Sequence, residues 1–125
     1  MAMKLWHTSG LKTLRQAAEL TNDWVASNPV VCKGFGQASL LVDLALGSLT
    51  EARLKIQFSP DGENWYDETD DNTAGHSAIE HVFTASGRYR LLVKLADQYI
   101  RVQAMGVGTT TGSSLAVYAT FRVEA

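Results

Sequence analysis

The sequence has very little cysteine. Cys32 is the only one in 125 residues, so no disulfide can form within the chain and no thiolate cluster can bind a metal ion. A nucleophilic thiol needs a neighbouring base, and no recognisable nucleophile motif surrounds this residue. We therefore expect a semi-buried structural thiol.

Long apolar runs and runs of one charge are also missing. No apolar stretch approaches the roughly 20 residues that a membrane helix needs, and residues 1–7 lack the apolar core and cleavage site of a signal peptide. We expect a soluble protein that is made in the cytoplasm and has no membrane partner. The eleven Lys and Arg are scattered, and the formal net charge of -2 gives no general attraction to nucleic acid. Nucleic-acid binding is therefore not expected.

The clearest positive pattern is the alternation of apolar and polar residues. It runs through residues 38–46, 52–58, 89–95 and 115–123, and Leu92 is an exception in the third run. Successive side chains of a strand point to opposite faces of a sheet, so each run predicts a strand with one buried side.

Weaker strands are expected at residues 77–84 and 99–105, and a short one at 65–68. Turn-forming residues separate all these runs, only two prolines are present, and no alternation of strands with helices is visible. The sequence thus predicts an all-β fold, an antiparallel β-sandwich of about eight strands, for which a jelly-roll order is one arrangement. We expect a single domain over residues 1–125, with residues 1–10 as an extended N-terminal arm.

The apolar faces of these strands define the expected core. Its members are Leu40, Val42, Leu44, Leu54, Ile56, Phe58, Tyr89, Leu91, Val93, Ile100, Val102, Val117, Phe121 and Val123.

The segment before residue 30 fits two structures. Leu11, Leu14, Ala18 and Val25 are spaced as on one face of a helix, and residues 11–20 contain no helix breaker, so the pattern alone slightly favours a helix. A strand face is the alternative, formed by Leu14, Ala18, Leu20 and Trp24.

The stretch FSPDGENWYDE, residues 58–68, predicts a tight corner between two strands. Pro60 presets the backbone of a turn, Asp61 can hydrogen-bond to nearby backbone, and Gly62 tolerates a positive φ. Phe58 ends one strand and Trp65 begins the next, so both rings are expected to cover the end of the core. The alternative is an exposed platform of Trp65 and the adjacent tyrosine for a sugar or a protein partner.

No residues form a recognisable reaction centre. The acids between residues 61 and 71 do not match the spacing of a calcium-binding EF-hand loop, and His76 and His81 are poorly spaced for sharing a metal ion. A glycosidase would need two opposed carboxylates, and nothing pairs Asp43 with Glu80. We expect no enzyme activity, no catalytic residue, no metal, no cofactor and no small-molecule substrate.

Residues 106–114 are rich in Gly, Thr and Ser. The segment is too short for a linker between domains and predicts a mobile loop between two strands.

The order of these motifs resembles small β-sandwich virion proteins of tailed bacteriophages. A strand at 52–58 leads into SPDGENWYD at 59–67, which is similar to their SPDGxNWY motif, and residues 99–102 (YIRV) are similar to their YVRV strand. The resemblance covers about residues 39–123. The chain departs from the pattern in its turn at 47–51 and in its acidic insert at 67–72.

The resemblance implies a non-enzymatic structural protein of a virion, with an extended N-terminal segment. We expect a capsid decoration or stabilisation protein on the capsid surface. Its partners would be the major capsid protein and further copies of itself, as a homo-oligomer for which a trimer would suit three-fold points of a shell. The expected contact surfaces are the N-terminal arm (residues 1–10) and two loops. The contact residues in the loops are Trp65, Tyr66, Asp67, Glu68, Asp70, Asp71, Thr109, Thr110 and Thr111.

Three other functions stay open at this point. A component of the tail or of the head–tail junction would have the same kind of fold. A carbohydrate-binding module would use Trp65 and Tyr66. A small hydrolase would need acids that converge in one pocket.

Overall fold

The alternation of apolar and polar residues produces β-strands and no helix in the described part of the chain. The computed structural model describes residues 6–69 and 77–124, in which eleven strands form two antiparallel sheets. The strands are β1 (Trp6–Thr8), β2 (Lys12–Ala18), β3 (Val25–Ala26), β4 (Val30–Val31), β5 (Gln37–Ala45), β6 (Leu49–Ser59), β7 (Tyr66–Asp67), β8 (His81–Phe83), β9 (Gly87–Lys94), β10 (Tyr99–Gly108) and β11 (Ser114–Glu124). No helix of these residues has the length and apolarity of a membrane span.

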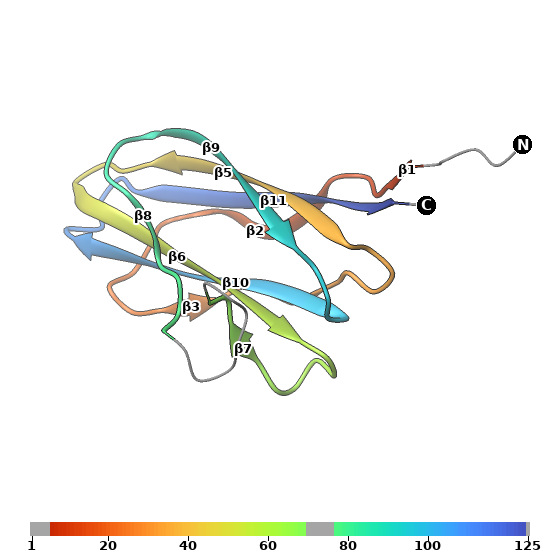
Figure 1. Cartoon of the computed structure of the whole chain (residues 1–125). Helices are drawn as coiled ribbons and strands as arrows, with labels where there is room; N and C mark the ends of the chain where they lie inside the picture. Colours follow the sequence, from red (N-terminus) through yellow and green to blue (C-terminus); the bar gives the residue numbers. More distant parts are fainter. Residues whose placement is uncertain (1–5, 70–76, 125) are drawn as a thin grey trace, which may run out of the picture.

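Short strands share positions at the edges of the sheets. In sheet A, β1 and β2 both pair with β11, which is followed by β5 and β9. In sheet B, β3 and β4 both pair with β10, which is followed by β6, and β7 and β8 both pair with β6. Each sheet therefore has four positions, and the two sheets lie as two layers (Figure 1). The predicted antiparallel sandwich of about eight strands is confirmed.

The core lies between the two layers and is made by the predicted faces. On β5 and β6, Leu40, Val42, Leu54 and Ile56 are fully buried. The predicted core is confirmed with three differences. Tyr89 and Leu91 are half-buried and pack against it, and Val123 is half-buried because it lies beyond the last β11 residue that pairs with β5.

The helical pattern before residue 30 was misleading, since this segment contains β2 and β3. Leu11 and Val25, two members of the expected helix face, are exposed, whereas Leu14 and Leu20 are buried. Hydrogen bonds to distant residues hold the segment extended. Arg15 donates to the carbonyl oxygen of Leu115, and the backbone N–H of Leu20 donates to Ser113 Oγ at 3.0 Å.

Asn22 contributes further to this long-range anchoring. Its side-chain amide donates to the carbonyl oxygens of Gly106 and Gly108, both at 2.9 Å. None of these partners is visible from local spacing, which explains why the pattern alone favoured a helix.

The extended segment that the family resemblance implied agrees with the structure. The strand face of the alternative is correct only for Leu14 and Leu20, because Ala18 is exposed and Trp24 is half-buried under Lys55.

The predicted loop at 106–114 is shorter than expected. Residues 106–108 continue β10, where they pair with β6 down to Leu49, and Ser114 begins β11. Only residues 109–113 form the turn. Close packing explains the difference at Gly106, because a Cβ there would lie 2.7 Å from a side-chain carbon of Leu49. Glycine here lets the two strands stay paired.

Candidate interaction surfaces

The corner between β6 and β7 is built by side chains that hydrogen-bond to backbone. Ser59 Oγ accepts from the N–H of Gly62 at 2.8 Å, and Asp61 Oδ1 accepts from the N–H groups of Asn64 (2.8 Å) and Glu63 (2.9 Å). Gly62 has a φ of 81°. The bonds from Asn64 and Glu63 lower the pKa of Asp61 well below its usual range, since they favour the charged carboxylate. The predicted corner is confirmed.

Trp65 does not cover the end of the core, in contrast to the prediction. Phe58 is buried there, but Trp65 is half-buried on the outer face of sheet B, where the guanidinium of Arg101 lies 4.2 Å from its ring centroid. Arg101 Nε also donates to Gln57 Oε1, and Gln57 Nε2 donates to Asp67 Oδ1, both at 2.8 Å. The reason is register: Gln57 lies opposite both Arg101 and Asp67, so a polar ladder crosses three strands and holds the indole outside.

Two tryptophans on the outer face of sheet B each have a cationic side chain over one face of the ring. Lys55 Nζ lies 4.4 Å from the ring centroid of Trp24, as Arg101 lies over Trp65. Tyr66 has an exposed fraction of 51%. Tyr66 pairs with the core-facing Phe58, so its phenol points to the opposite face of sheet B from the indole of Trp65, and the two rings do not form one platform.

The acidic residues near the corner are engaged with protein groups. Glu68 Oε1 lies 2.8 Å from His81 Nε2, and Asp67 accepts from Gln57. Within the described residues, no group of three or more His, Cys, Asp and Glu side chains is arranged to hold a metal ion. Asp70, Asp71 and His76 lie outside the described residues.

The predicted contact residues do not form one surface. Thr109, Thr110 and Thr111 lie in the β10–β11 turn beside the beginning of β6, whereas Trp65 and its neighbours lie beyond its end. The eleven residues of β6 separate the two groups by roughly 30 Å. The carbonyl oxygen of Thr111 also accepts from the N–H of Ser48 at 3.0 Å, so this turn packs against its neighbour.

Sequence reasoning missed the outer face of sheet A as a surface. Leu92 on β9 has an exposed fraction of 73% and Leu41 on β5 one of 38%, and both point away from the core. Four basic residues alternate with buried or half-buried residues on β9 and β11 and lie on this face. They are Arg88, Arg90, Lys94 and Arg122.

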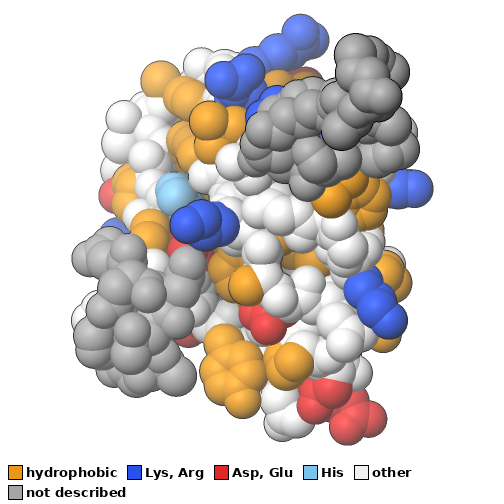
Figure 2. Space-filling model, turned by 45° about the vertical axis from the view of Figure 1, so that its right-hand side comes forward, with side chains coloured by type: hydrophobic (Ala, Val, Ile, Leu, Met, Phe, Trp, Pro, Cys, Tyr) orange, Lys and Arg blue, Asp and Glu red, His pale blue; other side chains and the backbone are white. Residues whose placement is uncertain are grey.

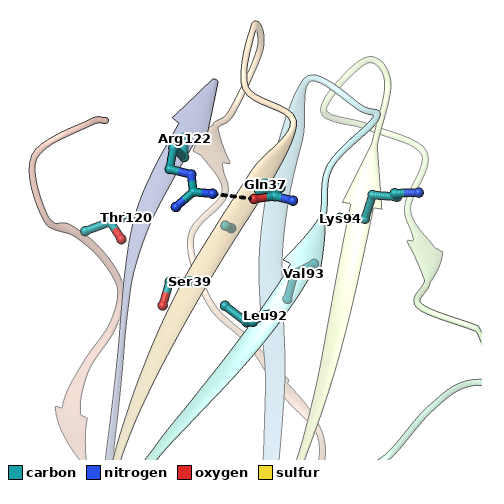
Figure 3. Close-up of a pocket in the computed structure, with 8 residues that line it drawn as sticks. Gln37, Ser39, Leu92, Val93, Lys94, Thr120 and Arg122 are labelled. Carbon is teal, nitrogen blue, oxygen red and sulfur yellow. Dashed lines mark hydrogen bonds between the residues drawn. The ribbon is translucent and has the colours of Figure 1, made fainter. Parts of the chain in front are cut away.

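A shallow hollow of about 320 Å³ lies at one end of this face (Figure 3). Leu92 and Lys94 line it from β9, Gln37 from β5 and Arg122 from β11, and Arg122 donates to Gln37 Oε1 at 3.3 Å. The sequence contains one signal for this surface. Leu92 breaks the alternation of its strand and so puts an apolar side chain on the solvent face.

Two other features of the molecule do not form an open site. A hollow of about 460 Å³ lies between the edges of the two sheets beside β2 and β3, but Arg15 in its wall donates to backbone carbonyls. Cys32 is fully buried, and burial, with a contribution from Asp97, raises the pKa of its thiol to about 11. This thiol is more buried than the sequence predicted.

The fold is similar to that in the crystal structure of the SPBc2 prophage-derived protein YomS. The superposition covers 98% of this chain and 96% of that chain, with a TM-score of 0.52 and 14% sequence identity. At this identity the likeness concerns the fold. No family model matches the chain, and no curated protein matches it.

Proposed function

We propose that this chain is a non-enzymatic structural protein of a tailed-phage particle, and that it decorates the capsid by binding the major coat protein and other copies of itself. The observation that carries the proposal is the likeness of fold, over nearly the whole chain, to a protein derived from a prophage. The SPDGENWYD corner is a second support, because this motif resembles one of small virion proteins of tailed phages. Its own residues make the hydrogen bonds that form the corner.

The strand order gives further support. Sheet A has the order β2, β11, β5, β9, and the facing sheet has β3 and β4 together, then β10, β6, and β7 and β8 together. We infer that this is a jelly roll, because the chain crosses to the opposite sheet after each strand position except after β6, which is followed by its own neighbours β7 and β8 in sheet B. Jelly rolls recur in viral capsid proteins and in lectins.

The physical role of such a protein is passive. A rigid sandwich presents loops and sheet faces, and many copies at symmetry-related positions add weak contacts into a large stabilisation of a shell. A coat-binding protein on the outside of a particle needs no basic surface for packaged DNA, in keeping with the formal net charge of -2.

Deletion of the gene tests the proposal. Particles that lack the protein should be less resistant to heat and to chelators, and added purified protein should restore that resistance. Quantitative mass spectrometry of intact particles should find a copy number that scales with the coat protein. A few copies per particle and defective tails would instead indicate a tail or head–tail junction component. Absence from purified particles would exclude both roles.

A carbohydrate-binding module is the second candidate, favoured by the exposed ring of Tyr66 and the half-buried indole of Trp65. Replacement of Trp65 by Ala should then abolish retention on a glycan column while the domain stays folded. Loss of the fold, or wild-type protein that no glycan retains, would speak against this function.

A further inference from the structure

We propose that the free edge of β9 binds an extended acidic segment of a partner protein, which adds to sheet A as a further strand. The inference goes beyond the proposed function, because it concerns the chemistry of one strand edge and holds whichever protein supplies the segment. It can be tested with synthetic peptides and without a phage particle.

Three of the four sheet edges in the described part of the chain are blunted. The two edges of sheet B are formed by β3 and β4, with two residues each, and by β7 and β8, with two and three. On one edge of sheet A, register shifts interrupt the pairing of β2 with β11. Very short edge strands and bulges prevent a further strand from adding to a sheet.

The edge formed by β9 has neither kind of protection. Its eight residues pair with β5 without a register shift. Within residues 6–69 and 77–124, no backbone group outside β5 is hydrogen-bonded to β9. About half of the N–H and C=O groups of an edge strand point away from its neighbour, so β9 presents unpaired donors and acceptors over about 27 Å. The backbone of an extended segment is the natural complement of such a row.

The charge of β9 selects which segment can add. This strand contains three basic residues and no acid, whereas the rest of the chain has eight basic and thirteen acidic residues. Figure 2 shows a separation of charge over one side of the molecule, because the acidic side chains gather at its lower end and most Lys and Arg lie above them. Like charges on neighbouring strands are destabilising, so a second copy of β9 is disfavoured and an acidic strand is favoured.

The three cations of β9 have no strong partner in the described part of the chain. Arg90 and Lys94 make no hydrogen bond or ion pair there. Arg88 Nε lies 3.8 Å from Asp43 Oδ2, and both side chains are at least half exposed. Such a pair contributes little free energy in water, so Arg88 stays available to another carboxylate. All three cations lie on the outer side of the strand, where acids at alternate positions of an added strand would meet them.

The other side of β9 favours apolar residues in the added strand. Tyr89 and Leu91 face the core but are only half-buried, because β9 is the last strand of its layer. Apolar side chains of an added strand would cover these two residues from the open edge. The segment that fits is therefore one in which acidic and apolar residues alternate.

A titration of the isotope-labelled chain, followed by nuclear magnetic resonance, tests the proposal. The probe is a capped peptide of eight residues in which Glu alternates with Val, added up to about 1 mM. Backbone amide signals of β9 should shift, and exchange of the β9 amide hydrogens with solvent should become slower. Binding should weaken when the salt concentration rises from about 50 mM to about 500 mM.

Two further peptides separate strand addition from simple attraction of charges. A peptide in which Lys alternates with Val should not bind, since it brings cations to cations. A peptide in which Glu alternates with Pro keeps every carboxylate but cannot form a ladder, and it should bind at least about tenfold more weakly. Equal binding of the Glu–Pro and Glu–Val peptides would overturn the proposal.

Charge reversal on β9 should exchange the preference. The double variant Arg90→Glu with Lys94→Glu should bind the Glu–Val peptide at least about tenfold more weakly and should now bind the Lys–Val peptide. The matched control, Lys12→Glu with Lys33→Glu, changes the net charge equally at exposed positions outside β9 and should bind like the wild type. Circular dichroism checks that each variant is folded.

The outcomes separate this site from the proposed function. A wild-type chain that binds no Glu–Val peptide, or that pairs through β9 with a second copy of itself, would overturn the proposal. If that chain still bound capsids, the decoration role would stand without this edge. Peptide binding by a chain that is absent from purified particles would support the edge site and exclude the decoration role.

Discussion

The carboxylate of Asp61 stabilises the corner between β6 and β7. It accepts hydrogen bonds from two backbone N–H groups and from the side-chain amide of Asn64, which lies 2.6 Å from Asp61 Oδ2. Its folded-state pKa therefore lies below the value of about 3.9 in an unfolded chain. Folding favours the ionised form, so the stability that it contributes is present above this unfolded value and is lost as the pH falls through the lower folded-state value.

Replacement of Asp61 by Asn should lower the midpoint of thermal unfolding at pH 7. The difference from the wild type should shrink as the pH falls from about 4 to about 2, because the wild-type carboxylate is then protonated in the unfolded chain and progressively in the folded one. Thermal scans across this range measure the effect. Glu63→Gln removes a neighbouring charge whose side chain makes no hydrogen bond in the described structure, and it should leave the midpoint nearly unchanged. A constant difference at all pH values would contradict the assignment.

Gly47 is a second residue whose identity the backbone dictates. It has a φ of 57°, and a Cβ there would lie 2.4 Å from the carbonyl carbon of Gly112 in the β10–β11 turn. Two turns from distant parts of the sequence thus touch through backbone atoms alone.

Gly47→Ala should destabilise the protein by more than about 2 kcal/mol, because it adds a backbone clash to a strained conformation. Gly10→Ala is the control, since nothing lies within 4 Å of its added Cβ. Its effect should stay within about 0.5 kcal/mol. Urea unfolding measures both, and equal effects would show that the two turns can move apart.

At the scale of the strand, neighbouring leucines of β5 have opposite roles. Leu40 is fully buried between the sheets, while Leu41 has an exposed fraction of 38% on the outer face of sheet A. The period of two that predicted this strand also predicts the contrast.

Leu40→Ala should cost about 2 to 5 kcal/mol, through lost burial and the cavity that it leaves. Leu41→Ala should cost less than about 1 kcal/mol, since the side chain is already partly in water. Chemical denaturation provides the two values. A large cost for Leu41 would mean that the outer face is covered by part of the chain.

The long strands and the corner could be predicted from sequence because their causes are local. Alternation fixed the buried sides of β5, β6 and β11, and three adjacent residues determined the turn at Pro60. The position of Trp65 could not be predicted, because it depends on Arg101 reaching across from another strand. The same limit applies to β2, whose extended form depends on groups near residues 106–115.

The outer face of sheet A was missed for a different reason. Exposed apolar residues are common on protein surfaces, so Leu41 and Leu92 alone predicted nothing. Only the pairing of β5 with β9 and β11 brings them together with the four basic residues.

At the scale of the whole molecule, strands that are neighbours in space are distant in sequence. β11 pairs with β1, β2 and β5, and β10 pairs with β3, β4 and β6. Loop-closure entropy must be overcome before these contacts form.

The chain should therefore refold slowly for its size, in about a millisecond to a second. Stopped-flow fluorescence of the tryptophans measures the rate after dilution from urea. The change that Leu40→Ala causes in the folding activation free energy, divided by the change that it causes in stability, measures how far the core around Leu40 has formed in the transition state. Complete folding within microseconds would contradict a topology dominated by distant pairings.

The pairing of β1 with β11 has a practical consequence. Trp6 lies opposite Glu124 in an antiparallel ladder, so the two ends of the described chain leave the sandwich side by side (Figure 1). A peptide grafted onto either end would emerge from the same pole of the molecule. A short bridge could join the ends into a circular backbone, and new ends could then be opened at an exposed turn without unpairing the central strands.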